Sequence, residues 1–274
     1  MSKHKHRTII VISLTLIIFL TSECSVFEER SFCPCWVGLD FSTVLAQDDL
    51  AGAEDEAIEL SVFDSNGQVA YCHTYGLDSC ASRYEVEIPR GLYTVSAVIR
   101  RQENAQDLNQ DIISIGTDRQ ADTIYGKSLC LDAGNETAEA VIEPFKQYSS
   151  IDIRILSSPF DSLNISIMAA SAAIDRKTLE GLPRQYSCTG TFSGDRAGFN
   201  ILRQTGGELR LSFSDTATGR HITDIDLGLW LNEIGYDFSA ESLADIVLIL
   251  DFYKGTASLS IAGWLDAPVY HVIF

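Results

Sequence analysis

Residue types that commonly carry catalysis or bind metals are sparse along this chain. Beyond the first 23 residues there are three histidines, His73, His221 and His271, and none lies in a recognisable catalytic motif. The cysteines lack the paired spacing of zinc sites, and acids such as Asp224 and Asp226 lack the spacing of a calcium-binding EF-hand loop. No glycine-rich phosphate loop is present. The sequence therefore predicts a protein that is not an enzyme and holds no metal or cofactor.

The amino terminus has the features of an export signal. Three basic residues precede the apolar stretch 8–20, which is too short to span a bilayer but matches the hydrophobic region of a secretory signal. Cys24 follows in a sequence similar to a bacterial lipobox, although Glu23 departs from the small residue that is usual there. We expect a signal peptide over residues 1–23 and lipidation of Cys24. The alternative is a plain secretory signal with an incidental cysteine.

The cysteines fit an oxidising compartment. Seven are present, and lipidation of Cys24 leaves an even number for disulfides. Cys72 and Cys80 flank a short loop and form a possible disulfide. Cys33 and Cys35 are too close for an ordinary bridge to each other.

The charge of the chain excludes one large class of partners. Acidic residues outnumber basic ones 38 to 20, which gives a net charge of −18. Such a charge repels the phosphate backbone of nucleic acids and anionic lipid headgroups. Hydrophobic residues make up 46% of the chain, enough for ordinary globular cores.

An alternation of apolar and polar residues, typical of β-strands, dominates the first half. The strand at 58–62 ends near Asn66-Gly67, which predicts a hairpin with a type I′ turn. A second hairpin is predicted between 84–88 and 92–99, through a turn that contains a glycine. The residues in the inward phase of this second pair are Val86, Ile88, Tyr93 and Val95.

The second half repeats this pattern after a short connector at residues 144–149. A strand is predicted at 150–155, another with Leu209, Leu211 and Phe213 on one face, and a helix at 224–232. Three consecutive strands are predicted at the end of the chain, over 246–253, 256–262 and 269–274. The predicted fold is all-β, with two tandem β-sandwich domains at 24–148 and 149–274.

Several short motifs resemble a known family. The stretch from Cys24 to Phe41, with Cys33-Pro34-Cys35, resembles the start of the fimbrial anchor lipoproteins of the Bacteroidales, the FimB and minor-fimbrium anchor family. Further matches are 88–95 (IPRGLYTV), 234–237 (IGYD) and the closing hairpin up to Gly263-Trp264. The resemblance spans the whole chain and rests on the order of these motifs.

This resemblance implies two transthyretin-like β-sandwiches and a surface-exposed lipoprotein, anchored in the outer membrane at the base of a type V fimbrium. The expected partners are fimbrial shaft or accessory subunits, together with the outer membrane through the lipid. Polymerising subunits of this kind lose their first strand to arginine-specific proteolysis. An anchor, which also limits fimbrial length, is expected to keep its first strand.

The last six residues are the candidates for partner binding: Val269, Tyr270, His271, Val272, Ile273 and Phe274. They either complete the carboxyl-terminal sheet or are donated to a fimbrial subunit by strand addition. The alternative function is a surface glycan-binding lipoprotein, since Trp36, Trp230 and Trp264 could stack on sugars. Trp230 and Trp264 lie in apolar patterns that favour a core position.

Overall fold

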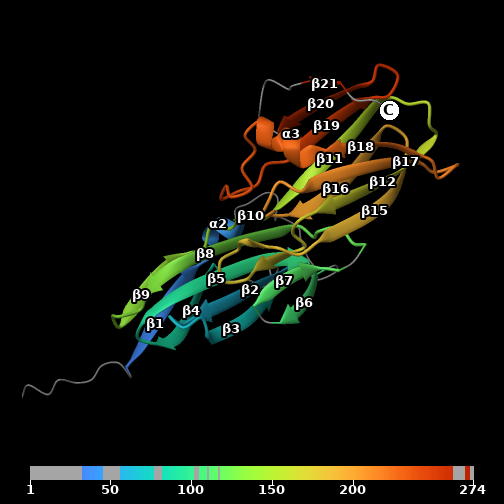
Figure 1. Ribbon diagram of the computed structural model, residues 1–274. Helices are drawn as coiled ribbons and strands as arrows, with labels where there is room; N and C mark the ends of the chain where they lie inside the picture. The colour runs from blue at the N-terminus through green and yellow to red at the C-terminus, as the bar shows by residue number, and fades with distance from the viewer. Residues whose placement is uncertain are drawn as a thin grey trace, which may run out of the picture.

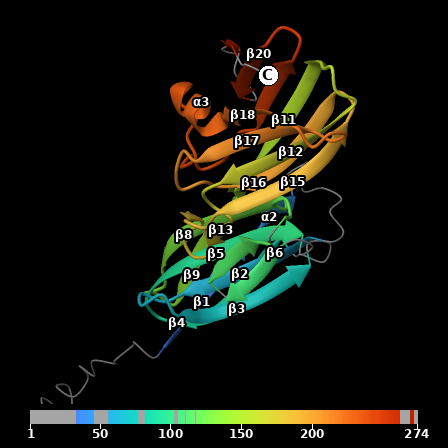
Figure 2. The same ribbon diagram turned by 45° about the vertical axis from the view of Figure 1, so that its right-hand side comes forward.

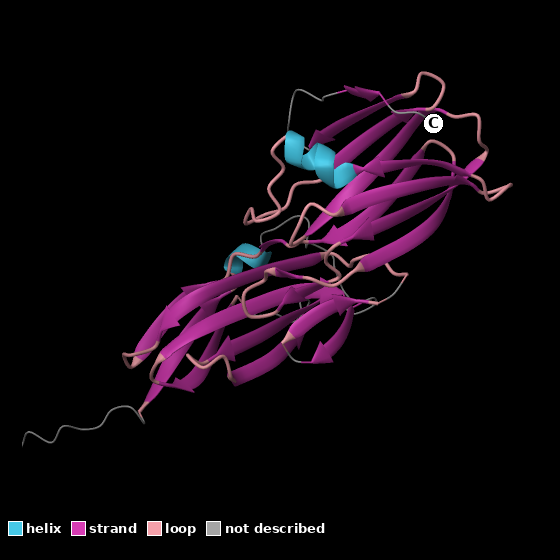
Figure 3. Cartoon of the chain, in the orientation of Figure 1, coloured by secondary structure: helices cyan, strands magenta, loops and turns pink. Residues whose placement is uncertain are grey.

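The computed structural model describes residues 33–45, 56–76, 82–101, 105–109, 111–116, 118–261 and 269–271. Within these ranges the chain is almost entirely β, with two short helices, α2 (Ser42–Leu45) and α3 (Leu227–Glu233). Neither helix has the length or apolar character needed to cross a bilayer. Figures 1 and 3 show two blocks of strands, and in Figure 1 the blue-to-green first half lies below the yellow-to-red second half. The predicted all-β fold of tandem sandwiches is confirmed.

The first sandwich is built from two sheets. Sheet A has the order β4 (Arg83–Pro89), β1 (Pro34–Asp40), β9 (Thr137–Val141). Sheet B has the order β10 (Phe145–Lys146), β8 (Ile124–Asp132), β5 (Leu92–Arg101), β2 (Glu56–Phe63), β3 (Val69–Gly76). Alternate residues of both sheets form a buried core. Val37, Leu60 and Val95 belong to it, and each of these three is at most 2% exposed. These are the inward positions of the alternating sequence pattern.

The second sandwich is also built from two sheets. Sheet D has the order β16 (Arg196–Leu202), β11 (Tyr148–Ser157), β19 (Ile246–Asp251), β20 (Thr256–Ile261), β21 (Val269–His271). Sheet E has the order β15 (Tyr186–Ser193), β12 (Ser162–Ala169), β17 (Leu209–Asp215), β18 (His221–Asp226). Leu209, Leu211 and Phe213 are buried as predicted. The predicted helix begins later than expected, because its first residues extend β18 and Asp226 caps α3 by accepting a hydrogen bond from Leu229 N at 3.0 Å.

A fifth sheet, sheet C, joins the two halves. It has the order β14 (Gly181–Leu182), β13 (Ala173–Asp175), β7 (Ile112–Ile115), β6 (Ala105–Asn109). The segment that carries β13 and β14, residues 170–185, connects β12 to β15, and we call it the arm. Figure 2 shows β13 at the junction between the two blocks of strands. The arm thus leaves the second sandwich to pair with a strand of the first half of the chain.

The arm is fastened to the outer face of sheet B. Glu59 on β2 lies between two guanidinium groups, 2.9 Å from Arg100 and 2.8 Å from Arg176 of the arm. All three residues are at most 6% exposed. Ser96 donates a hydrogen bond to the carbonyl oxygen of Arg176. Removing one member of such a buried ionic group leaves an uncompensated charge and costs about 3–5 kcal/mol.

The first predicted hairpin is present, but its turn differs from the prediction. β2 and β3 pair in antiparallel fashion up to Phe63 and Val69. Gly67 has φ +80°, whereas Asn66 is not among the residues with positive φ, so the type I′ turn is wrong. Gly67 N donates to Asp64 O at 2.9 Å, and the Asp64 carboxylate accepts the N–H of Gln68 at 2.8 Å. The carboxylate also accepts the N–H of Asn66 at 2.9 Å. These bonds to the side chain favour a longer loop, and the one from Gln68 is the main cause that holds the pKa of Asp64 below its usual value.

The second predicted hairpin is wrong. β4 pairs with β1 in sheet A, whereas β5 pairs with β2 and β8 in sheet B. The connection through Gly91 therefore crosses from one sheet to the other. The predicted inward residues are nevertheless buried: Val86, Ile88, Tyr93 and Val95. Alternation identifies the core face of a strand but does not identify its neighbour.

Candidate functional site

The first strand, β1, is central in sheet A. It pairs with β4 over seven residue pairs and with β9 over five, so both of its edges are occupied. Cys35, Val37 and Leu39 point into the core and are at most 2% exposed. Burial raises the pKa of the Cys35 thiol, which keeps it in the neutral form. Without β1, a groove lined by the apolar side chains of β4 and β9 would open between those strands.

The sequence around β1 offers no basic residue at which it could be released. After Arg30, the next lysine or arginine is Arg83, at the start of β4. The connection from β1 to β2 therefore contains no cleavage point for an arginine-specific protease. Because β1 is the central strand of sheet A, the lack of such a cleavage point means that this protease would leave the sheet complete.

The partner-binding candidates at the carboxyl terminus fall partly on β21. This strand pairs with β20 over three residues, from Thr256 opposite His271 to Ser258 opposite Val269. β21 is at the edge of sheet D, so its second edge has no strand among the described residues. Val272, Ile273 and Phe274 lie outside the described residues. Residues 269–271 of the predicted partner-binding segment are thus paired with sheet D. The role of this segment in partner binding stays a prediction.

Asp251 holds the turn between β19 and β20, the strand with which β21 pairs. Asp251 ends β19 and accepts hydrogen bonds from the Ser157 hydroxyl and from Lys254 N, the latter at 3.1 Å. Its carboxylate also lies 3.0 Å from the Lys254 ammonium. The Ser157 hydrogen bond is the main cause that lowers the pKa of Asp251 to about 2. Asp251 is therefore ionised at neutral pH and fixes the turn that leads to β20.

Two of the cysteines singled out from the sequence lie outside the described residues. They are Cys24, the predicted lipidation site, and Cys80. Cys72 is exposed on β3, where its sulfur accepts a hydrogen bond from Ser61 at 3.7 Å. The disulfide between Cys72 and Cys80 stays a prediction.

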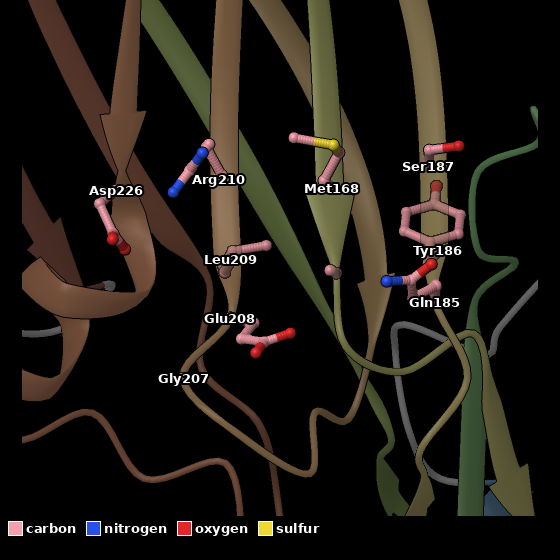
Figure 4. Close-up of a pocket in the computed structure, with 10 residues that line it drawn as sticks. Met168, Gln185, Tyr186, Ser187, Gly207, Glu208, Leu209, Arg210 and Asp226 are labelled. Atoms are coloured by element: carbon pink, nitrogen blue, oxygen red, sulfur yellow. The ribbon is translucent and has the colours of Figure 1, made fainter.

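A pocket of about 610 Å³ lies at one end of the outer face of sheet E. Figure 4 shows Met168, Arg210 and Asp226 on neighbouring strands, with Glu208 and Gln185 pointing toward one another from opposite sides. Met168 is opposite Arg210, and Arg210 is opposite Asp226 in the strand register. The pocket thus offers charged and amide groups beside one exposed thioether. Sequence reasoning missed it because its members come from four strands and two loops.

The described residues contain no group of three or more histidine, cysteine or acidic side chains arranged to hold a metal. His221 Nε2 lies 3.8 Å from an Asp224 carboxylate oxygen on an exposed surface. His73 lies between Tyr71 and Tyr75 on the edge strand of sheet B and contacts the Tyr75 ring edge-on. These contacts of His73 and His221, with two tyrosine rings and one carboxylate, do not include a serine or cysteine side chain. The absence of catalytic activity stays a prediction.

The tryptophans differ in exposure. Trp230 packs against the core of the second sandwich, as predicted, and Trp264 lies outside the described residues. Trp36 is 50% exposed on the outer face of sheet A. The alternation of Cys35, Val37 and Leu39 could have revealed this outward position, because neighbouring residues of a strand point to opposite faces.

The fold has clear counterparts among solved structures, although no protein-family model matches the sequence and no curated protein matches it. The fimbrial anchor protein Mfa2 from Porphyromonas gingivalis superposes with a TM-score of 0.58 and 18% identity, covering 85% of this chain and 99% of that one. A predicted polysaccharide-binding protein from Bacteroides thetaiotaomicron gives a TM-score of 0.58 and 15% identity, over 87% and 98% of the chains.

A third counterpart is a predicted adhesin from Bacteroides ovatus, with a TM-score of 0.57 and 13% identity, over 89% of this chain and 97% of that one. These identities are low, so the likeness establishes a shared fold over nearly the full length of each protein. The two-sandwich architecture is therefore one that these solved proteins also adopt.

Proposed function

We propose that this chain is a non-enzymatic, lipid-anchored surface protein that holds a fimbrium to the outer membrane and limits its length. The observation that carries this proposal is the position of β1. A subunit that keeps a first strand paired on both edges has no open groove for the next subunit's strand. Such a subunit ends a polymer rather than extending it.

Three further features support the proposal. No basic residue lies between Arg30 and Arg83, so β1 cannot be trimmed away from β2 by an arginine-specific protease. Among the described residues β21 pairs with one strand, β20, which suits a segment that a partner can engage. The Mfa2 protein, which has the same fold, is described as a fimbrial anchor.

The test is a deletion of the gene in the bacterium that carries it, followed by electron microscopy of fimbriae on cells and in the medium. We expect longer fimbriae, most of them shed, and recovery of short, cell-bound fimbriae with the wild-type gene. A Cys24→Ala gene should restore fimbrial length control less well, because the protein loses its lipid attachment. Fimbriae of unchanged length and attachment in the deletion strain would contradict the proposal.

A second candidate function is glycan binding, which the pocket on sheet E favours. Arg210, Asp226 and Glu208 supply hydrogen-bonding groups of the kind that orient sugars, and Met168 supplies an apolar contact. The test is a glycan array probed with the full-length protein and with Arg210→Ala. Signals that disappear with this substitution would support glycan binding, and an array without signals would exclude it for the sugars displayed.

A further inference from the structure

The outer face of sheet A presents a tryptophan beside unsatisfied negative charge. Trp36 on β1 is directly opposite Glu87 on β4, and both side chains are exposed. Directly opposite residues in an antiparallel pair have Cβ atoms about 5 Å apart, so the Glu87 carboxylate is within reach of the indole ring. Among the residues that the structure describes, the Glu87 side chain has no ion pair or hydrogen bond. The pair therefore combines an open aromatic face with an available carboxylate.

On one side Trp36 borders a closed ion pair. Gly38 is the next outward residue of β1, and the Arg83 guanidinium and the Glu139 carboxylate pair across it at 2.6 Å. A Cβ at position 38 would contact the ends of both side chains, so a larger residue would displace them. Arg83 and Glu139 thus neutralise one another beside the indole, which leaves Glu87 as the carboxylate that a partner's cation can reach.

The charge of this face is unbalanced. Its outward residues include four carboxylates, which are Asp40, Glu85, Glu87 and Glu139. They also include one basic group, Arg83. Arg83 is committed to Glu139 and lies 4.0 Å from Glu85. A cation placed between Trp36 and Glu87 would gain from both the ring and the carboxylate. A neutral sugar would gain no charge–charge attraction from the excess negative charge, and an anionic membrane would be repelled.

We propose that the outer face of sheet A docks an extended, basic segment of a partner protein, with a lysine or arginine side chain seated between Trp36 and Glu87. Glu85 and Glu87 are two residues apart on β4, a spacing of roughly 7 Å. Alternate side chains of an extended chain have the same spacing, so a segment with basic residues at alternate positions can meet both carboxylates. This docking does not depend on the proposed anchoring role, since it requires only that β1 stays in sheet A and involves neither the lipid nor β21.

The test uses the full-length protein and a labelled, terminally blocked peptide of sequence threonine-arginine-threonine-arginine-threonine. Fluorescence anisotropy measures Kd, and NMR of the three tryptophan indole groups locates the contact. Trp36→Phe identifies the Trp36 signal by its loss. We expect the peptide to shift that signal and to bind less tightly in 0.5 M salt, and a peptide with glutamine in place of arginine to bind far more weakly.

Matched variants make the test specific. Trp36→Ala and Glu87→Gln should each raise Kd about two- to fivefold, as expected for a cation contact at an exposed site. Tyr253→Ala is the control, because Tyr253 is 71% exposed on the second sandwich and should leave Kd unchanged. All are surface changes, so unchanged Tm values should accompany them.

Three outcomes would overturn the proposal. The glutamine peptide could bind as well as the arginine peptide, or both site variants could leave Kd unchanged. Glucan oligosaccharides or phosphatidylcholine vesicles could instead shift the Trp36 indole signal while the arginine peptide does not, which would assign the face to a glycan or a membrane.

Discussion

The first and the last strands that the structure describes are held in opposite ways. β1 is paired over seven residues on one edge and five on the other, and its inward side chains fill the core of the first sandwich. Within the described part of the chain, β21 is paired over three residues on one edge. Each backbone hydrogen bond contributes about 1 kcal/mol, and a buried leucine or valine about 1.5–3 kcal/mol more.

This difference separates a structural strand from a strand available for exchange. Removing β1 would remove the centre of sheet A and its core contacts, whereas removing β21 would shorten sheet D at its edge. A polymer-ending subunit needs this asymmetry, because it must engage a partner at one end without offering a groove at the other.

The largest effect is expected for Leu39→Ala on β1. Leu39 is fully buried, and truncating such a leucine costs about 2–5 kcal/mol because a cavity remains. Urea unfolding of the full-length protein measures the change. Trp36→Ala, on the outer face of the same strand, is the matched control and should cost about 0.5 kcal/mol or less. Equal effects at the two positions would show that β1 is not anchored through its inner face.

A smaller effect is expected when residues 269–274 are deleted. The lost pairing with β20 spans three residues, so the free energy of unfolding should fall by about 1–3 kcal/mol while the protein stays folded. Circular dichroism and urea unfolding measure this, and a pull-down with purified shaft subunits measures partner capture, which we expect to be lost. A truncated protein that aggregates would show that the segment is a structural part of sheet D.

A still smaller, pH-dependent effect is expected for Asp251→Asn. The pKa of Asp251 is lowered to about 2, compared with about 3.9 in an unfolded chain. The ionised carboxylate therefore stabilises the fold fully above about pH 4, and this contribution is lost as the pH falls toward 2. Asp251→Asn should lower Tm at pH 7, with the difference shrinking between pH 4 and 2. The exposed Asp161→Asn is the control, and a Tm difference that is constant with pH would refute the assignment.

The smallest effect is expected from an arginine-specific protease acting on the native protein. Cleavage after Arg30 should leave a product that begins at Ser31 and keeps β1, as mass spectrometry would show. Gly52→Arg supplies the missing basic residue before β2 and should allow a second cut, whereas Gly52→Gln should not. Loss of β1 from the wild-type protein would remove the main support for a polymer-ending role.

The sequence predicted those parts of the fold that depend on one strand at a time. Leu209, Leu211 and Phe213 alternate because one face of β17 meets the core, and that local pattern was sufficient. The neighbours of a strand depend on contacts far away in the chain. For this reason the hairpin between β4 and β5 was wrong, and the arm was not anticipated from strands of two or three residues.

The candidate sites follow the same rule. The outward position of Trp36 follows from alternation along β1, but its partner Glu87 is on a strand that was assigned to the wrong neighbour. The pocket on sheet E gathers side chains from strands that become adjacent only when the sheet forms. Residue types indicate what a position can do, and long-range pairing decides which positions act together.

The arm makes completion of the amino-terminal sandwich wait for a distant part of the chain. A polypeptide is delivered from its amino terminus, so sheets A and B can assemble before the arm exists. Until residues 173–182 follow, Val98 and Glu59 on the outer face of sheet B remain in water, and Arg176 is not yet there to join Glu59. The outer face of sheet B is therefore covered only after the chain has been made as far as the arm. Folding of the first half is thus completed during synthesis of the second half.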